Sequence, residues 1–170
     1  MLLQLYYYPP EDRLEFRGLS PQDVEALADF FDTLVKSGAE EFFHPHPFTR
    51  REAESKCNYA GKDLYYVLAG GKRIVGYGML RGWDEGHEIP SLGIAIHPDF
   101  RGRGYGRLLM GNLHAAARWR GARVIRLKVE RGNDPARKLY ETLGYHFDVE
   151  RNNEFVGLCD LVKQCEAPRS

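Results

Sequence analysis

The stretch Ile94-Ala95-Ile96-His97-Pro98-Asp99-Phe100-Arg101-Gly102-Arg103-Gly104-Tyr105-Gly106-Arg107-Leu108-Leu109 decides the fold. An apolar strand ends at His97-Pro98, a turn rich in glycine and arginine follows, and an amphipathic helix begins inside that turn. The first turn of a helix has unpaired N–H groups and a partial positive charge, so this junction favours an anion. The pattern therefore predicts an anion-binding site between a strand and a helix.

The residues of the turn indicate which anion it suits. Glycine lets a backbone approach phosphate oxygens closely, and arginine adds forked cationic donors. The Walker pattern fails because no Lys-Ser/Thr pair follows, and the dinucleotide pattern fails because Arg107 stands where its third glycine belongs. The pattern Arg-x-x-Gly-x-Gly is satisfied by Arg101, Gly104 and Gly106. It predicts a pyrophosphate cradle, and a solvated turn is the alternative.

Periodicity and capping residues predict the elements before this stretch. Ser20-Pro21 opens a helix that Gly38 ends, and Thr49 caps a second helix. Gly70-Gly71 has the form of a two-residue hairpin turn. The predicted strands lie at 14–17, 63–69, 73–81 and 89–97, and the second helix at 50–59.

The second half of the chain alternates helices and strands. A helix is predicted over 104–120 and a strand over 124–130, in which Ile125, Leu127 and Val129 alternate with polar residues. Asn133-Asp134-Pro135 opens a last helix that Gly144 ends. Strands at 145–150 and 154–162 complete the order β-α-α-β-β-β-α-β-α-β-β. This order predicts an α/β fold with antiparallel pairing first and βαβ crossovers later.

The length of the chain limits the number of domains, and its charge limits the expected partners. A chain of 170 residues suits one domain, predicted over 1–170 with an N-terminal extension at 1–12 and a frayed tail at 166–170. Basic and acidic side chains number 24 each, so the formal net charge is +0. Nucleic acid is not an expected partner because its binders usually carry a basic field.

Hydropathy and cysteine content point to the cytoplasm. No apolar run approaches the ~20 residues that cross a bilayer, so no membrane partner is expected. The cysteines Cys57, Cys159 and Cys165 are odd in number and form no Cys-x-x-Cys pair. This argues against a disulfide framework or a zinc site and favours a reducing compartment. The oligomeric state, including a homodimer, is left open by the sequence.

Together these residues resemble the GNAT superfamily, the Gcn5-related N-acetyltransferases. Arg101-x-x-Gly104-x-Gly106 looks like that family's acyl-CoA pyrophosphate signature, and the segment from Asn133 to Tyr145 looks like its next sequence block. The resemblance covers about residues 14–162. It implies the GNAT acyl-CoA N-acyltransferase fold, a central mixed, mostly antiparallel sheet flanked by about four helices.

The resemblance also implies a use for the strand and the turn. Acetyl-CoA would be the acyl donor and CoA a product, with the pantetheine arm alongside the strand and an amine attacking the thioester directly. A backbone N–H of the strand would meet the thioester carbonyl as in an oxyanion site. The cofactor-binding residues implied are Ile94, Ala95, Ile96, Arg101, Gly102, Arg103, Gly104, Tyr105, Gly106, Arg107 and Asn133.

Candidates for proton transfer are less clearly marked. Tyr140 resembles the family's general acid, and its alternative is a core aromatic on the helix stripe. Glu88 and His87 precede the central strand, where the family often places a carboxylate or a water relay; Glu88 is the candidate base, and a solvated turn is its alternative. Ser91 stands where many relatives carry glutamate. Pro90 disfavours ladder pairing and indicates an edge or splayed position.

The segment 42–48, Phe-Phe-His-Pro-His-Pro-Phe, lies between the first two helices. The resemblance implies that it forms one wall of the acceptor site, so His44, His46 and Ser91 are predicted to bind substrate. Loop packing is the alternative for both histidines. A His-x-His metal site lacks a third ligand nearby in the sequence, so no metal is predicted. Aromatic residues on the strands and in the next loop would line the acceptor cleft or belong to the core: Tyr65, Tyr66, Tyr77 and Trp83.

The leading hypothesis is therefore an acyl-CoA-dependent enzyme. It would transfer an acetyl group from acetyl-CoA to a primary amine of a small molecule or peptide. A non-catalytic acyl-CoA-binding regulatory module is the alternative, because Ser91 replaces an acid. A nucleotide-binding protein is a third hypothesis, already weakened by the two failed motifs.

Overall fold

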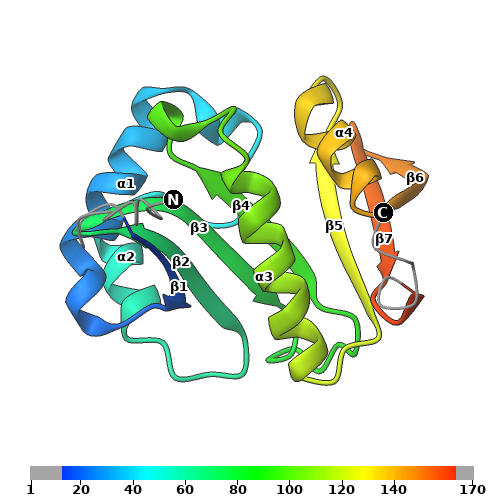
Figure 1. Ribbon diagram of the computed structural model, residues 1–170, viewed down its shortest axis with the longest axis horizontal. Coiled ribbons are helices and arrows are strands. Elements are labelled where there is room, and N and C mark those ends of the chain that lie inside the picture. The colour runs from blue at the N-terminus through cyan, green and yellow to red at the C-terminus, as the bar shows by residue number, and fades with distance from the viewer. Residues whose placement is uncertain (1–12, 164–170) are drawn as a thin grey trace, which may run out of the picture.

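A computed structural model describes residues 13–163, and its strands form one seven-stranded sheet in the order β1-β2-β3-β4-β5-β7-β6 (Figure 1). The β4–β5 pair is parallel, and every other neighbouring pair is antiparallel. The predicted extension at 1–12, the tail at 166–170 and Cys165 lie outside the described residues. The mixed, mostly antiparallel sheet predicted from the sequence is confirmed.

The order of elements also matches the prediction. Four α-helices and seven strands are joined by short 3₁₀ turns in the described residues. Their bounds are β1 Leu14–Gly18, α1 Val24–Lys36, α2 Arg50–Cys57, β2 Leu64–Gly70, β3 Arg73–Arg81, β4 Ser91–Ile96, α3 Tyr105–Trp119, β5 Val124–Glu130, α4 Asp134–Thr142, β6 His146–Arg151 and β7 Glu154–Asp160.

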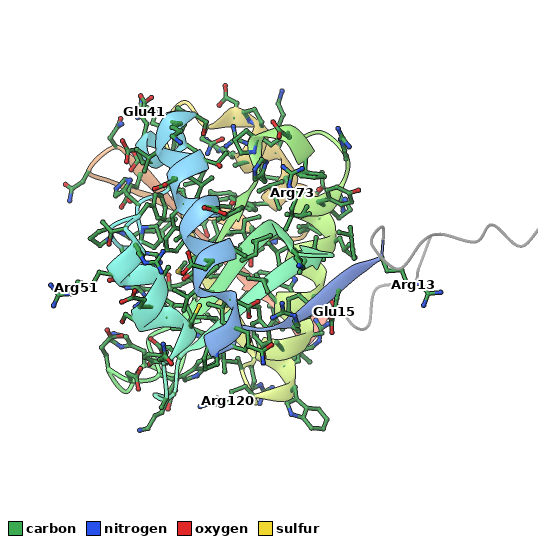
Figure 2. All side chains as sticks on the ribbon, turned by 90° about the vertical axis from the view of Figure 1, so that its left-hand side faces the viewer. Arg13, Glu15, Glu41, Arg51, Arg73 and Arg120 are labelled. Atoms are coloured by element: carbon green, nitrogen blue, oxygen red, sulfur yellow. The ribbon has the colours of Figure 1, made fainter. Side chains whose placement is uncertain are left out.

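Helices cover both faces of the sheet. Buried side chains of α1 and α2, such as Phe30 and Leu34, pack with Tyr77 and Met79 of β3 on one face. Buried side chains of α3, such as Leu113, pack with the apolar side chains of β5 on the other face. Figure 2 shows these two layers from the side, with the labelled Arg51 and Arg120 pointing away from the core.

The start of α1 is fixed by a small polar cluster. Ser20 precedes the 3₁₀ turn Pro21–Asp23, and the Asp23 carboxylate accepts from the Ser20 backbone N–H at 2.8 Å. The Arg17 guanidinium donates both of its terminal nitrogens to Asp23 at 2.7 Å. Hydrogen bonding from Arg17 lowers the pKa of this carboxyl group. The predicted helix start at Ser20-Pro21 is thus confirmed, as is the end at Gly38, whose φ of 71° closes the helix.

The β2–β3 hairpin turns one residue later than predicted. Gly70 lies in β2 and pairs with Arg73, so the turn consists of Gly71 and Lys72. Gly71 has φ of 58°, and Lys72 is outside the positive-φ region. A positive φ at the first turn position alone is the pattern of a II′ turn, which favours glycine there. The prediction of Gly70-Gly71 was wrong by one residue because either glycine of the pair satisfies the rule.

The sheet divides between β4 and β5. These two strands share a single residue pair, Ser91 with Arg126, within the described residues. The Arg126 N–H donates to the Pro90 carbonyl at 3.0 Å, and beyond this point the strands diverge. Figure 1 shows β5, β6, β7 and α4 standing apart from β1 to β4. The edge or splayed position predicted at Pro90 is wrong, because the Pro90 carbonyl is bonded to β5 and the strands separate only beyond Ser91.

Candidate active site

A cleft of about 1200 Å³ occupies the divergence between β4 and β5. All of β4 lines it, together with the second half of β5, the start of α4 and the α1–α2 loop. The lining residues are Ala39, Phe42, Phe43, His44, Pro45, Met79, Arg81, Glu85, His87, Ser91, Leu92, Gly93, Ile94, Ala95, Ile96, Arg101, Gly106, Arg126, Lys128, Val129, Glu130, Gly132, Asn133, Pro135, Ala136, Leu139, Tyr140 and Glu154.

Strand alternation divides this lining into two walls. Ile125, Leu127 and Val129 of β5 belong to the core beneath α3, so the residues between them face the α1–α2 side. Those intervening residues are Arg126, Lys128 and Glu130. The wall toward α3 and α4 is therefore largely apolar, and the wall toward α1 and α2 carries charge.

The register of β4 determines which backbone groups face the cleft. The His97 N–H donates to the Val75 carbonyl at 2.9 Å, which extends the antiparallel β3–β4 ladder. Bonded and non-bonded pairs alternate in such a ladder, so the polar backbone groups of Ala95 face β3. Those of Ile94 and Ile96 face the cleft. Of the three residues expected to pair with a pantetheine arm, Ile94 and Ile96 are so oriented and Ala95 is not.

The glycine-rich turn lies where α3 begins. Gly102 and Gly104 have φ values of 72° and 82°, which side-chain-bearing residues rarely adopt. No side chain caps α3 at Gly104, so its first N–H groups face outward from the turn. A Cβ on either glycine would meet no heavy atom within 4 Å. This open, uncapped helix start fits the pyrophosphate of an acyl-CoA.

The arginines of the turn take different positions. The Nε of Arg101 donates to the Ile96 carbonyl at 3.3 Å, at the edge of the cleft. Arg103 stacks over Phe100, with its Cζ 5.4 Å from the ring centre. Arg107 donates to the Thr142 hydroxyl at 2.6 Å and so connects α3 to α4. Arg101 and Gly106 line the cleft, whereas the turn and helix residues Gly102, Arg103, Gly104, Tyr105 and Arg107 are outside its lining.

Helix α4 brings Asn133 and Tyr140 to the cleft. The Asn133 side-chain oxygen accepts from the Ala136 N–H at 3.4 Å and caps the helix. Tyr140 is 8% exposed, and burial raises its pKa to about 12. A phenol with this pKa keeps its proton at neutral pH and can donate it. Tyr140 also belongs to the core beneath α3, so both sequence interpretations of this residue describe part of its position.

The α1–α2 loop separates the two predicted histidines. His44 lines the cleft, and its Nε2 lies 3.9 Å from Oε1 of Glu130 across it. Its Nδ1 lies 3.1 Å from the Glu40 carbonyl, which can only accept, so Nδ1 carries a proton. His46 instead contacts Tyr77 and does not line the cleft. Loop packing is the better account of His46.

The β3–β4 loop places other candidates. Its backbone is held by Asp63, whose carboxylate accepts three N–H groups, from Gly82, Trp83 and Asp84, at 2.9 to 3.3 Å. Glu88 is exposed and does not line the cleft, whereas Glu85, His87 and Ser91 do. The aromatic residues weighed as cleft or core are outside the lining, with Tyr65 and Tyr77 buried, Tyr66 stacked on Phe16 and Trp83 under Arg120.

Sequence reasoning missed the charged residues of the α1–α2 wall. Arg81 ends β3, Lys128 lies on β5, and the Lys128 ammonium pairs with Glu154 of β7 at 2.5 Å. The alternation of Arg126, Lys128 and Glu130 along β5 was visible in the sequence. Which side of that strand faces the cleft depends on the register of three strands. Within residues 13–163 no group of three His, Cys, Asp or Glu is arranged to hold a metal, and no helix is long and apolar enough to cross a membrane.

Known proteins share both sequence and fold with this chain. An acetyltransferase of Pectobacterium atrosepticum is 30% identical over 132 residues, covering 78% of this chain and 87% of that protein. The PaiA N-acetyltransferase of Thermoplasma acidophilum, solved in complex with coenzyme A, superposes with a TM-score of 0.68 at 17% identity, covering 87% and 99% of the two chains. A spermidine N-acetyltransferase SpeG chimera from Vibrio cholerae and hSSAT gives a TM-score of 0.73 at 19% identity, over 92% and 100%.

The sequence profile of the Acetyltransferase (GNAT) family matches residues 29–145 of this chain. That range runs from α1 through α4 and includes β4, the glycine-rich turn and Tyr140. The chain therefore belongs to the GNAT acetyltransferase family.

Proposed function

We propose that this protein is an N-acetyltransferase that moves an acetyl group from acetyl-CoA to a primary amine of a small molecule or peptide. The observation that carries the proposal is the single β4–β5 residue pair, which leaves the backbone groups of Ile94 and Ile96 facing a cleft. That cleft reaches Arg101 and Gly106, on either side of the uncapped start of α3, and is also lined by Tyr140. A strand edge, an anion site and a proton donor are thus aligned along one groove.

Acetyl-CoA supplies an acetyl group activated as a thioester when it is bound. Ile94 and Ile96 would pair with its pantetheine arm, and Asn133 would contact the same arm. The helix start at Gly104 and the Arg101 guanidinium would hold the pyrophosphate. A β4 backbone N–H would donate to the carbonyl oxygen as charge develops there. The groove holds both reactants side by side, which supplies much of the rate.

The proton of the attacking amine needs an acceptor, because alkyl amines have a pKa near ~10 and react only when neutral. His44 is the best-placed group in the lining. Its Nδ1 proton is fixed by the Glu40 carbonyl, so the lone pair of neutral His44 is on Nε2, the nitrogen nearest Glu130. We assign the base to His44, with the Glu130 carboxylate beside the same Nε2 to stabilise the imidazolium that forms, and Glu88, outside the lining, is the competing candidate.

Tyr140 would return a proton to the departing sulfur. Its phenol is buried among apolar side chains of the α3 face, and this burial keeps it protonated. An acid on the α4 wall and a base on the α1–α2 wall would act from opposite sides of one cleft. The base would take the proton of the amine on one side of the groove, and the acid would protonate the sulfur on the other. Because the two groups are on opposite walls, neither would transfer its proton directly to the other.

We also place the reaction in the cytoplasm. Cys57 and Cys159 are free and buried, and burial raises the pKa of each thiol to about 11. Such thiols stay protonated and suit a reducing compartment. Neither nucleic acid nor a membrane surface is among the proposed partners, which are acetyl-CoA and an amine.

Release of free thiol from acetyl-CoA in the presence of an amine panel tests the function. Amine-dependent release with a matching mass gain of one acetyl group on the amine is the expected result. Tight CoA binding without release for any amine would instead support the non-catalytic acyl-CoA-binding module. That alternative rests on Ser91, which occupies a position that lines the cleft without supplying a carboxylate.

A further inference from the structure

Three side chains form a row across neighbouring strands at the closed end of the cleft. Ser91 of β4 pairs with Arg81 of β3 on one side and with Arg126 of β5 on the other. Directly paired residues share a face of the sheet, and strands lie about 4.8 Å apart. The two arginine Cα atoms are therefore roughly 10 Å apart with a hydroxyl group between them. All three residues line the cleft.

The charges of this row are not neutralised by the protein. Elsewhere in the cleft, Lys128 pairs with Glu154 and His44 lies beside Glu130. Within residues 13–163, by contrast, neither Arg81 nor Arg126 forms an ion pair with a carboxylate. Glu85 lines the same end of the cleft without forming an ion pair to either of them.

A structural role accounts for only one of the two arginines. The Arg81 Nη1 donates to the Pro45 carbonyl at 2.8 Å and holds the α1–α2 loop against β3. Arg126 is exposed to the cleft and has no such contact among the described residues. A guanidinium fork matches the paired oxygens of a carboxylate or phosphate group.

We propose that Arg81, Ser91 and Arg126 bind an anionic group of the acceptor, so that the substrate class is an amine that also carries a carboxylate or phosphate. This inference rests on the proposed acetyl transfer and specifies its acceptor. The row lies on the charged wall, opposite the apolar wall that belongs to the donor. Ile94, whose backbone faces the cleft, is three residues along β4, or roughly 10 Å from Ser91. An amine held at the row by its anionic group can reach toward that position.

Matched pairs of acceptors test the proposal, each pair differing by the anionic group. Phenylalanine with phenethylamine and 5-aminopentanoate with pentylamine test the carboxylate at two separations. O-Phosphoethanolamine with ethanolamine tests the phosphate. In the native protein we expect kcat/KM to favour the anionic member of at least one pair by about tenfold or more, and the preferred pair identifies the source of the anion.

Arg126→Gln should lower that preference at least tenfold, and Arg126→Lys, which keeps the charge without the fork, should lower it less. Arg123→Gln is the matched control, because Arg123 is exposed just before β5 and does not line the cleft. It should leave the preference unchanged. Arg81→Gln should act in the same direction as Arg126→Gln. Thermal unfolding of each variant checks that a loss of preference is not a loss of fold.

Calorimetric binding of the same compounds in the presence of CoA, which carries no acetyl group, separates this proposal from the proposed function. Binding of anionic amines that Arg126→Gln abolishes, without turnover by the native protein, would leave the anion site standing and remove the acetyl transfer. Turnover of both members of every pair at equal efficiency would overturn the anion site and leave the transfer standing. Loss of both readouts would remove both proposals.

Discussion

The imidazole of His46 and the phenol of Tyr77 form a hydrogen bond, with Nε2 and Oη 3.0 Å apart. The Nδ1 of His46 lies 3.0 Å from the Pro47 carbonyl and must donate to it, so Nε2 is left to accept from the Tyr77 hydroxyl. Phe31 and Phe48 surround the ring, at centroid distances of 5.4 and 5.6 Å. Burial lowers the pKa of His46.

This neutral histidine predicts a loss of stability in acid. The unfolded chain binds a proton near pH ~6.5, whereas folded His46 resists it, so the unfolded state holds more protons below that pH. The free energy of unfolding should therefore fall as the pH drops from 7.5 to 5.5, by up to about 1.4 kcal/mol per pH unit for one proton. Burial also lowers the pKa of His97, which adds to the same trend. Urea unfolding at the two pH values measures the slope.

His46→Gln should flatten that slope and cost about 1–3 kcal/mol at pH 7.5, because Tyr77 loses its partner. His87→Gln, at an exposed position, is the control and should leave the free energy of unfolding at pH 7.5 unchanged. An unchanged slope in His46→Gln would show that His46 titrates alike in the folded and unfolded chain.

The glycine-rich turn gives a second prediction. Gly104→Val places a β-branched residue at φ of 82° and should raise the KM for acetyl-CoA by about tenfold or more. Arg101→Ala should act in the same direction through loss of a cation. Gly111→Ala, in the middle of α3 with no heavy atom near its Cβ, should leave that KM alone and stabilise the helix by about 0.5–1 kcal/mol. Unaltered acetyl-CoA affinity in both Gly104→Val and Arg101→Ala would show that the pyrophosphate does not bind at this turn.

Tyr140→Phe tests the proposed acid. The variant keeps the ring in its buried position and removes only the hydroxyl, so the KM for acetyl-CoA should change little. We expect kcat to fall by about 10²-fold, a typical contribution for proton transfer. Tyr66→Phe, at a ring stacked on Phe16 away from the cleft, is the matched control. A Tyr140→Phe enzyme with the native rate and pH profile would reduce Tyr140 to a core residue.

His44 and Glu88 make opposing predictions about the base. If His44 accepts the proton, His44→Gln should lower kcat/KM by about 10²-fold. Glu130→Gln should have a smaller effect in the same direction, because the Glu130 carboxylate beside Nε2 would stabilise the imidazolium. Loss of turnover in Glu88→Gln, with His44→Gln fully active, would return the assignment to Glu88.

Much of the fold follows from local signals that the tertiary structure does not override. Ser20-Pro21, Gly38 and the alternation of 124–130 each specify a boundary or a face through backbone geometry alone. The β2–β3 turn was predicted one residue too early because two consecutive glycines are locally equivalent. Only the pairing of Gly70 with Arg73 distinguishes them.

The site was less predictable than the fold. The glycine-rich turn was readable because its chemistry is contiguous, within Arg101 to Arg107. The wall toward α1 and α2 is assembled from β3, β4, β5 and two loops, and no spacing in the sequence indicates that Arg81 and Arg126 both flank Ser91. The two histidines of the α1–α2 loop look alike in the sequence, and only the contacts of His46 with Tyr77 and of His44 with the cleft tell them apart.

The divergence of β4 and β5 also bears on solubility. A strand edge with unpaired backbone groups can pair with a strand of another molecule and so promote aggregation. Proteins protect such edges by shortening, charging or covering them. Here the edge of β4 is placed inside the molecule, between α4 and the α1–α2 loop. A strand of another molecule, with side chains on both faces, would collide with those walls. The fold thus keeps the cleft-facing backbone groups of Ile94 and Ile96 away from the strands of other molecules.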